Sequence, residues 1–373
     1  MTALDPALAR LRDAILQAAA DHAPLTLRGG GTKDFYGRKP APGATVLDTR
    51  EWSGIVDYDC AELVVTARCG TPLAEVEAAL AEHRQMLAFE PPHFAAGGAR
   101  ATVGGAFACG LSGPRRQSVG ALRDFVLGAV IMDGRGDLLN FGGQVMKNVA
   151  GYDVSRLMAG ALGTLGLVAQ VSLKVLPMPF CDATLRLAMP QAEAIDTLNR
   201  WGGQPLPIAA SAWIDGTLWV RLCGADAAVR AARARLGGDR VDEAEALALW
   251  RDLREQSHAF FAPAVQGSLP LWRIALPPAT PPLALGPAAA ADDQLIEWGG
   301  GQRWWIDTGN TPADAIRDAV RLAGGHATLF RNGDRDSAVF TPVAAPLMAV
   351  HKRLKDSFDP HGIFNPGRLY ADF

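Results

Sequence analysis

The start of the chain alternates between apolar and polar residues at helical spacing. Leucine or isoleucine recurs there every three or four positions, at Leu4, Leu8, Leu11 and Ile15. This pattern predicts an amphipathic helix that ends before Pro24. Thr71 and Pro72 predict the start of a second helix, because threonine is a common N-cap and proline suits the first helical position. That helix is expected to run to His83 or Arg84.

Strands are predicted where short apolar runs lie between turn residues, up to residue 179. These runs are residues 25–27, 45–48, 62–67, 86–89, 125–132, 137–141 and 167–175. The turn 133–136 contains Asp-Gly between two of the runs, which predicts a β-hairpin. Small residues at 102–109 predict a short helix that ends at Gly110, and residues 154–158 predict another. A proline-rich stretch then ends this region.

The pattern changes after residue 180. Predicted strands alternate there with predicted helices, the strands at 212–214, 218–222, 294–298, 303–307 and 327–330 and the helices at 225–236, 242–260 and 311–322. The alternation predicts one antiparallel sheet covered by helices, an α+β layer. Residues 277–293 are rich in proline and alanine and are expected to form an exposed loop. A final helix is predicted at 343–358, so the expected domains are residues 1–179, 180–341 and 342–373.

Composition narrows the class of protein. The chain has 373 residues with a formal net charge of −3, and 49% of its residues are hydrophobic. It is therefore long enough for two or three globular domains, and its weak charge gives no reason to expect a nucleic-acid partner. Acidic residues interrupt the first helix, and no apolar run reaches the ~18–20 residues of a membrane span. We expect a cytoplasmic protein, with attachment to the inner face of the cell membrane through a partner left open.

Candidate chemistry first appears at a triple glycine that follows the strand predicted at 25–27. Gly29, Gly30 and Gly31 lack Cβ atoms, so the backbone there can approach a ligand closely and its N–H groups can converge on an anion. Arg28 and Lys33 add positive charge, and Thr32 adds a hydroxyl group. Taken by itself, the segment is equally consistent with an ordinary hairpin turn. Neither a P-loop nor a G-x-G-x-x-G motif at a strand–helix junction is present.

Four further segments follow the triple glycine, and the five together are LTLRGGGTK, ATVGGAFACGLSGPRR, GALRDFVLGAVIMDGRGDLL, KNVAGYDVSRLMAGALGTLGLV and FDPHGIFNPGRL. With these segments in this order, the chain resembles the vanillyl-alcohol oxidase / p-cresol methylhydroxylase family of FAD proteins. The likeness covers residues 24–179 and the C-terminal tail. It implies an α+β fold, namely a two-subdomain FAD-binding domain, a smaller α+β cap domain, and a C-terminal helix and tail that return to the FAD domain.

The resemblance also implies which residues hold the cofactor. Those expected at the pyrophosphate are Arg28, Gly29, Gly30, Gly31, Thr32 and Lys33. Those expected to line the flavin and pyrophosphate from the other subdomain are Thr102, Val103, Gly104 and Gly105, with Gly110 and Ser112 on the same wall. Gly166 and Val168 are expected near the adenine, and Asn365 and Arg368 at the flavin end. For Asn365 a turn or helix-end role is an equal alternative.

Two departures from the family pattern refine these expectations. Members that tether the flavin covalently often carry histidine directly after the glycines, whereas this chain has Thr32, so we expect non-covalent FAD. Cys109 lies among apolar neighbours and is expected to be a packed thiol. Relatives that oxidise 2-hydroxy acids carry a histidine- and carboxylate-rich cluster in the cap, whereas the cap histidines of this chain, His258 and His326, stand apart from each other. The cysteines are scattered without a C-x-x-C pair. No metal site is therefore expected.

Candidates for catalysis are weaker than those for FAD binding. His326 follows two glycines and is a candidate base, with an exposed loop histidine as the favoured alternative. Arg331, with Arg335 near it, is a candidate for holding a carboxylate. Tyr152 and Lys147 are expected near the flavin edge by their family position.

Within the family, KNVAGYD and the short second half are similar to the smaller FAD-binding subunit of bacterial glycolate oxidase. This likeness implies oxidation of glycolate, a small 2-hydroxy acid, to glyoxylate, with hydride transfer from the α-carbon to the flavin. It also implies a larger FAD-containing sister subunit and an iron–sulfur subunit as partners. The alternatives are a self-sufficient dehydrogenase for an acid such as D-lactate, and a non-catalytic assembly subunit. The missing histidine cluster favours hydride transfer at the sister subunit.

Overall fold

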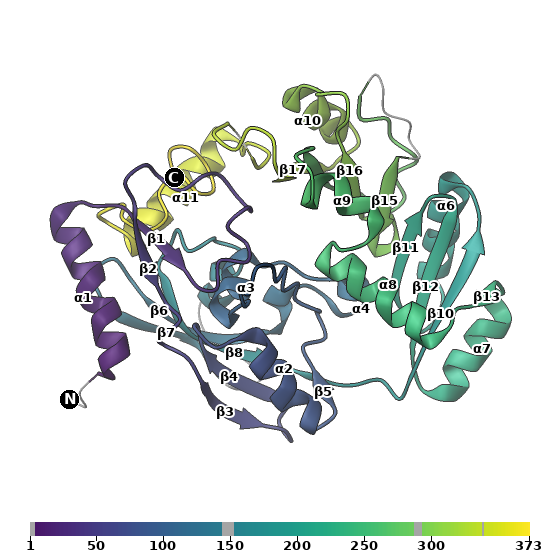
Figure 1. Ribbon diagram of the computed structural model, residues 1–373, viewed down its shortest axis with the longest axis horizontal. Helices are drawn as coiled ribbons and strands as arrows, with labels where there is room; N and C mark the ends of the chain where they lie inside the picture. Colours follow the sequence, from purple (N-terminus) through teal and green to yellow (C-terminus); the bar gives the residue numbers. More distant parts are fainter. Residues whose placement is uncertain (1–3, 144–152, 287–292, 338) are drawn as a thin grey trace.

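The computed structural model describes residues 4–143, 153–286, 293–337 and 339–373 (Figure 1). Helix α1 (Pro6–Asp21) begins the chain, as its apolar spacing predicts. Its buried face packs Leu8, Leu11 and Ile15 against the parallel pair β1 (Leu25–Arg28) and β2 (Thr45–Asp48). Asp5 caps the helix by accepting a hydrogen bond from the backbone N–H of Ala7.

A five-stranded antiparallel sheet forms the core of the N-terminal part. Its strand order is β3 (Ile55–Asp59), β4 (Val64–Arg68), β8 (Leu167–Lys174), β6 (Val126–Met132) and β7 (Leu138–Gly142). The predicted hairpin is the pair β6–β7. The helices of this part are α2 (Leu73–Glu82), α3 (Val103–Cys109), α4 (Arg116–Val119) and α5 (Val154–Met158). Buried residues of α2 and α3, among them Leu73, Val76 and Phe107, cluster with those of the sheet.

The cap is built on an eight-stranded sheet whose neighbouring strands are all antiparallel. Its order is β13 (Asp239–Arg240), β10 (Cys181–Ala188), β12 (Thr217–Gly224), β11 (Ile208–Ile214), β15 (Gln294–Glu297), β16 (Gln302–Ile306), β14 (Leu271–Ala275) and β17 (His326–Arg331). Its helices are α6 (Gln191–Gly202), α7 (Asp226–Leu236), α8 (Glu243–Glu255), α9 (Ala262–Val265) and α10 (Ala313–Leu322). The α+β fold expected from the sequence is confirmed.

Side-chain alternation gives the second half of the cap sheet two different faces. On one face, Leu271, Trp304 and Phe330 cluster with Tyr36 and Leu111 of the N-terminal part. We call this the inner face. On the opposite face, Trp272 and Trp305 pack against helix α10. The inner face therefore places cap residues directly against the N-terminal part.

The C-terminal helix α11 (Ala345–Phe358) and the tail return to the N-terminal part, and Figure 1 shows them beside α1 and β1. The tail runs parallel to β1. The backbone N–H of Leu25 donates to the carbonyl of Ile363 at 2.7 Å, and the N–H of Asn365 donates to Leu25 at 3.0 Å. The buried ammonium of Lys355 donates to Asp359 at 2.9 Å and to the carbonyl of Thr164 at 2.7 Å, which fixes the helix end.

Some local predictions were wrong. Thr71 does not cap α2, because its hydroxyl accepts from the N–H of Gly54 and donates to the carbonyl of Arg68. The strand predicted at 86–89 is only β5 (Gln85–Met86), paired with β9 (Leu176–Pro177). The helix predicted to reach residue 260 ends at Glu255, where Gln256 takes a left-handed conformation with φ 56°. Strands β3, β10 and β14 and helix α6 were not predicted, although the buried residues of α6 recur at helical spacing.

Candidate functional site

Two close contacts explain why the turn after β1 consists of glycines. A Cβ atom on Gly30 would lie 1.6 Å from the carbonyl oxygen of Arg100, and one on Gly29 would lie 2.3 Å from Oγ1 of Thr102. Gly31 has φ +74°, which residues with a side chain adopt at a cost. The turn therefore packs its backbone directly against the segment that precedes α3.

This packing leaves a row of backbone donors unused. Among the described residues, none accepts a hydrogen bond from the backbone N–H groups of residues 29–33, and the first N–H with a partner is that of Asp34, which donates to Gly31 at 3.2 Å. Consecutive unpaired N–H groups in a glycine turn form a nest that binds anions. The anion site expected from the sequence therefore has a physical basis in the backbone.

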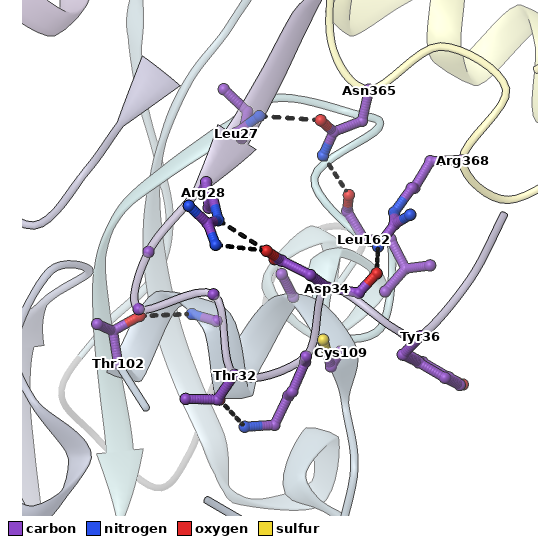
Figure 2. Close-up of a pocket in the computed structure, with 16 residues that line it drawn as sticks. Leu27, Arg28, Thr32, Asp34, Tyr36, Thr102, Cys109, Leu162, Asn365 and Arg368 are labelled. Atoms are coloured by element: carbon purple, nitrogen blue, oxygen red, sulfur yellow. Dashed lines mark hydrogen bonds and ion pairs between the residues drawn. The ribbon is translucent and has the colours of Figure 1, made fainter. Parts of the chain in front are cut away.

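Two cavities meet at this turn. The first has an empty volume of about 550 Å³, and Figure 2 shows its lining, which includes Gly30, Lys33, Tyr36, Cys109 and Arg368. We call it the polar cavity. The second has an empty volume of about 400 Å³, and residues found only in its lining are Thr49, Cys69, Gly104, Gly163, Gly166, Leu167 and Val168. We call it the apolar cavity. Both are lined by Gly29 and Gly105, so the pair suits an elongated ligand with an anionic centre.

The charges around the polar cavity favour an anion. Arg28 is paired with Asp34 at 2.6 Å. Lys33 is buried, and loss of water lowers the pKa of its ammonium group, while Cys109 and Glu255 oppose the shift. Burial also lowers the pKa of Arg368 to about 10. Its guanidinium donates to the carbonyl oxygens of Arg38 and Asp34. An anion in the cavity would compensate the buried cations.

Asn365 holds two walls of the polar cavity together (Figure 2). Its side-chain oxygen accepts a hydrogen bond from the backbone N–H of Leu27 at 2.9 Å. Its amide nitrogen donates to the carbonyl of Leu162 at 2.6 Å. The residue has φ 41°, a conformation that asparagine tolerates better than most residues. The turn role left open in the sequence is therefore present, at the wall of the cavity.

The start of α3 lines the cavities, but its backbone N–H groups already donate hydrogen bonds within the protein and are not free to bind a ligand. Thr102 and Gly105 line the polar cavity, and Gly104 and Gly105 line the apolar one. The N–H groups of Gly104 and Gly105 donate to Cys69 at 2.8 Å and to the hydroxyl of Thr102 at 3.2 Å. Val103 lines neither cavity, because its side chain lies in the core and its N–H donates to Thr71.

Of the other residues expected to contact FAD, two line the apolar cavity and two line neither the polar nor the apolar cavity. Gly166 and Val168 line the apolar cavity. Gly110 lines neither cavity and ends α3 with φ 62°, in contact with Gly160. The hydroxyl of Ser112 accepts from the N–H of Leu122 and faces a third cavity, between the N-terminal part and the cap. Sequence reasoning missed several lining residues, among them Asp34, Tyr36, Thr49 and Leu162.

None of the candidate catalytic residues that the structure describes lines either cavity. Lys147 and Tyr152 lie outside the described residues. His326 is exposed at the start of the edge strand β17. Arg331 stacks over Phe35, with its guanidinium carbon 3.4 Å from the ring centroid. Arg335 donates to the carbonyls of the loop after the glycine turn, at residues 34, 37 and 38, and so supports that loop.

Cys109 lines the polar cavity, but its thiol is poorly suited to form a covalent bond with a ligand. Burial raises the pKa of this thiol, although Lys33 and Arg368 act in the opposite direction. A protonated thiol is a weak nucleophile. Among the described residues, no group of three or more His, Cys, Asp or Glu side chains is arranged to hold a metal ion.

These residues fit FAD. The unpaired N–H groups of the turn fit a pyrophosphate, and the two cavities on either side leave room for the two ends of a dinucleotide. A comparison with family models agrees, because residues 8–142 match the FAD binding domain.

Known proteins resemble the chain to different extents. It is 48% identical to the glycolate oxidase subunit GlcE of Escherichia coli (strain K12) over 364 residues, 97% of each chain. It is 33% identical to the glycolate oxidase subunit GlcD of Bacillus subtilis (strain 168) over 172 residues, which cover 46% of this chain and 36% of GlcD. It is 34% identical to the D-lactate dehydrogenase of Archaeoglobus fulgidus over 189 residues, which cover 50% of this chain and 40% of that enzyme.

A solved structure of alkyldihydroxyacetonephosphate synthase superposes with a TM-score of 0.66 at 14% identity. The match covers 96% of this chain and 75% of the other, so the fold is shared. The 48% identity to GlcE over 97% of both chains confirms the family resemblance drawn from the five sequence segments, and FAD is the cofactor of the family. The chain belongs to the vanillyl-alcohol oxidase / p-cresol methylhydroxylase family of FAD-binding flavoproteins, on the branch that includes the glycolate oxidase subunit GlcE.

Proposed function

We propose that this chain is the FAD-binding subunit of a complex that oxidises glycolate, a 2-hydroxy acid, to glyoxylate. The observation that carries the proposal is the 48% identity to GlcE over 97% of both chains. The matches to GlcD and to the D-lactate dehydrogenase cover 46% and 50% of the chain. Of these three relatives, GlcE is the one whose likeness extends over both the FAD-binding part and the cap.

The residues of the glycine turn would bind the cofactor through its pyrophosphate. The N–H groups of residues 29–33 supply the donors, and Lys33 and Arg368 supply buried positive charge. Asn365 and Gly105 shape the walls, so their role is to position the cofactor. When bound, FAD supplies a two-electron acceptor for hydride and passes electrons onward. The buried, protonated thiol of Cys109 supports a non-covalent cofactor.

Partners are part of the proposal. The likeness to the glycolate oxidase subunits supports a multisubunit complex. We propose that its other members are a larger FAD-containing sister subunit and an iron–sulfur subunit that takes the electrons. Within the described residues, no helix is both long and apolar enough to cross a membrane. We place the complex in the cytoplasm, with contact to the inner face of the membrane made by a partner.

The test is affinity purification of the full chain from its native cell. Flavin content, co-purifying subunits and glycolate-dependent dye reduction are measured on the complex, and dye reduction is then measured on the chain by itself. We expect bound FAD, the two partner subunits, and glycolate oxidation by the complex. A single chain that reduces dye with D-lactate would support the self-sufficient dehydrogenase instead. A colourless chain in an active complex would support the non-catalytic assembly subunit.

A further inference from the structure

A third cavity lies between the N-terminal part and the inner face of the cap sheet. Its empty volume is about 320 Å³, which includes space open to solvent. We call it the interdomain cavity. Phe94, Leu111 and Ser112 line it from the N-terminal part. From the cap it is lined mainly by Gln256, Arg273, Glu297, Gln302, Trp304 and Phe330.

Gln256 contributes an unpartnered donor to this cavity. Its side chain is 2% exposed, and its Oε1 accepts a hydrogen bond from Nε of Arg331 at 2.7 Å. Because a guanidinium can only donate, the amide oxygen must face Arg331. The Nε2 group then points away from Arg331, and it has no hydrogen-bond partner among the described residues. A buried amide N–H₂ group without an acceptor is uncommon in native structures, so it indicates an absent acceptor.

Arg273 contributes a guanidinium that forms no ion pair with a described carboxylate, although its charge acts on Glu297 and opposes the rise in the pKa of that group. Within the described part of the chain, its guanidinium forms no hydrogen bond or ion pair, and it lies 5.9 Å from the ring centroid of Trp298. Strand β14 places Arg273 on the same face as Leu271, the inner face. A half-buried guanidinium and an amide donor that line the same cavity form a suitable site for a carboxylate.

Glu297 contributes an acceptor to the same cavity. Its Oε2 accepts from Nε1 of Trp304 at 2.7 Å and from Nε2 of Gln302 at 3.0 Å. Its Oε1 has no partner among the residues that the structure describes. Burial raises the pKa of Glu297 to about 7, so its carboxyl group can either donate or accept near neutral pH. Such a group is suited to a ligand hydroxyl.

The interdomain cavity is next to the polar cavity. Phe94 lines the interdomain cavity, and its ring centroid is 5.6 Å from Nζ of Lys33, which lines the polar one. On the same boundary, the rings of Phe330 and Tyr36 are 5.1 Å apart. Aromatic side chains therefore form the wall between the proposed cofactor site and this cavity.

We propose that the interdomain cavity binds a small 2-hydroxy carboxylate, with Arg273 and Gln256 holding its carboxylate and Glu297 holding its hydroxyl. The choice of a 2-hydroxy acid rests on the proposed function, whereas the carboxylate chemistry rests on the unpaired donors. Arg331 acts as a positioning residue, because it orients the amide of Gln256. Leu111 and Phe94 offer apolar contact to a short carbon chain.

The test is calorimetric titration of the FAD-loaded full chain with glycolate, with acetate as a ligand that lacks the hydroxyl. We expect glycolate to bind more tightly than acetate. Arg273→Met and Gln256→Leu each remove a donor to the carboxylate and should weaken glycolate binding roughly tenfold or more. The control is Arg321→Met, because Arg321 is exposed on α10 and pairs only with Asp318. Circular dichroism checks that each variant is folded.

A second measurement needs no variant. Phenylglyoxal modifies accessible arginines, and peptide mass spectrometry reports the extent at each one. Glycolate should protect Arg273 and leave Arg321 unchanged. Wild-type affinity in both folded variants, or absence of protection at saturating glycolate, would overturn the proposal. The two proposals fail separately. Glycolate binding that depends on Arg273, in a complex that does not oxidise glycolate, contradicts only the proposed function. An active complex in which Arg273→Met binds glycolate like the wild type contradicts only this site.

Discussion

The side-chain oxygen of Asn365 accepts a hydrogen bond from the backbone N–H of Leu27, across 338 positions of the sequence. Leu27 lies one residue before the end of β1, so this bond attaches the C-terminal tail to the strand that leads into the glycine turn. The side-chain amide nitrogen of Asn365 donates a hydrogen bond to the backbone carbonyl of Leu162. A single asparagine thus connects three distant segments around the polar cavity, and the cavity depends on the tail.

Replacement of Asn365 should loosen this junction. Asn365→Ala removes both side-chain hydrogen bonds and places alanine at φ 41°, so we expect a loss of about 1–3 kcal/mol in stability and weaker FAD binding. Asn365→Gly also removes the hydrogen bonds, but glycine tolerates this backbone conformation. The stability and FAD binding of Asn365→Gly should therefore lie between those of the wild type and those of Asn365→Ala. Thermal unfolding and FAD retention after gel filtration measure the effects. Equal FAD retention in all three proteins would show that the tail does not support the site.

Substitutions at the glycines of the site should differ in their effects on folding and on FAD binding. Gly30→Ala brings a Cβ atom within 1.6 Å of a backbone carbonyl, so we expect little soluble protein. A Cβ atom on Gly105 meets only Oγ1 of Thr102, at 3.2 Å, and the residue lines both cavities. Gly105→Leu should therefore fold and lose FAD.

The control for Gly105→Leu is Gly202→Leu, at the end of α6, where a Cβ atom meets no atom within 4 Å. Flavin absorbance per mole of protein and the unfolding temperature are compared. A Gly105→Leu protein that keeps its full flavin content would contradict the placement of FAD in these cavities.

FAD should leave the protein on denaturation. Thr32 occupies the position where tethering relatives often carry histidine, and burial keeps the thiol of Cys109 protonated. After acid precipitation we expect a colourless pellet and all of the flavin in the supernatant, and Cys109→Ser should leave this result unchanged. Flavin that stays with the pellet, and with one peptide after digestion, would contradict non-covalent binding.

Glu297 should make stability depend on pH. Burial raises its pKa from 4.5 to about 7, with Glu90 acting in the same direction and Trp304, Gln302 and Arg273 acting against it. The folded protein therefore retains a proton that the unfolded chain releases as the pH rises between these values. Stability should fall with rising pH across this window, by up to about 3 kcal/mol, and this contribution should stay constant above it.

Glu297→Gln carries no titrating proton, so its stability should lack this decline. We expect the variant to gain on the wild type as the pH rises towards 7. Glu82→Gln, on the exposed end of α2, is the control and should follow the wild type. Chemical denaturation at several pH values measures the difference. Parallel pH profiles for Glu297→Gln and the wild type would show that Glu297 ionises with its ordinary pKa.

The sequence by itself determined the features that depend on near neighbours. Apolar spacing predicted α1, the Asp-Gly turn predicted the β6–β7 hairpin, and Thr102 predicted the start of α3, where its side chain accepts from Gly105. Five glycine-rich segments in order indicated the family and FAD. These signals are local, because helix periodicity, turn conformation and capping depend on residues within a few positions.

Tertiary structure alone decided how distant segments meet. Only the fold places Arg100 against Gly30, so that glycine is required there by a close contact and not by its own backbone conformation. Only the fold returns Asn365 to Leu27, and only the inner face of the cap sheet brings Arg273 and Glu297 to one cavity with Gln256. Such contacts join residues far apart in the chain and leave no periodic pattern, because their energy depends on packing in three dimensions.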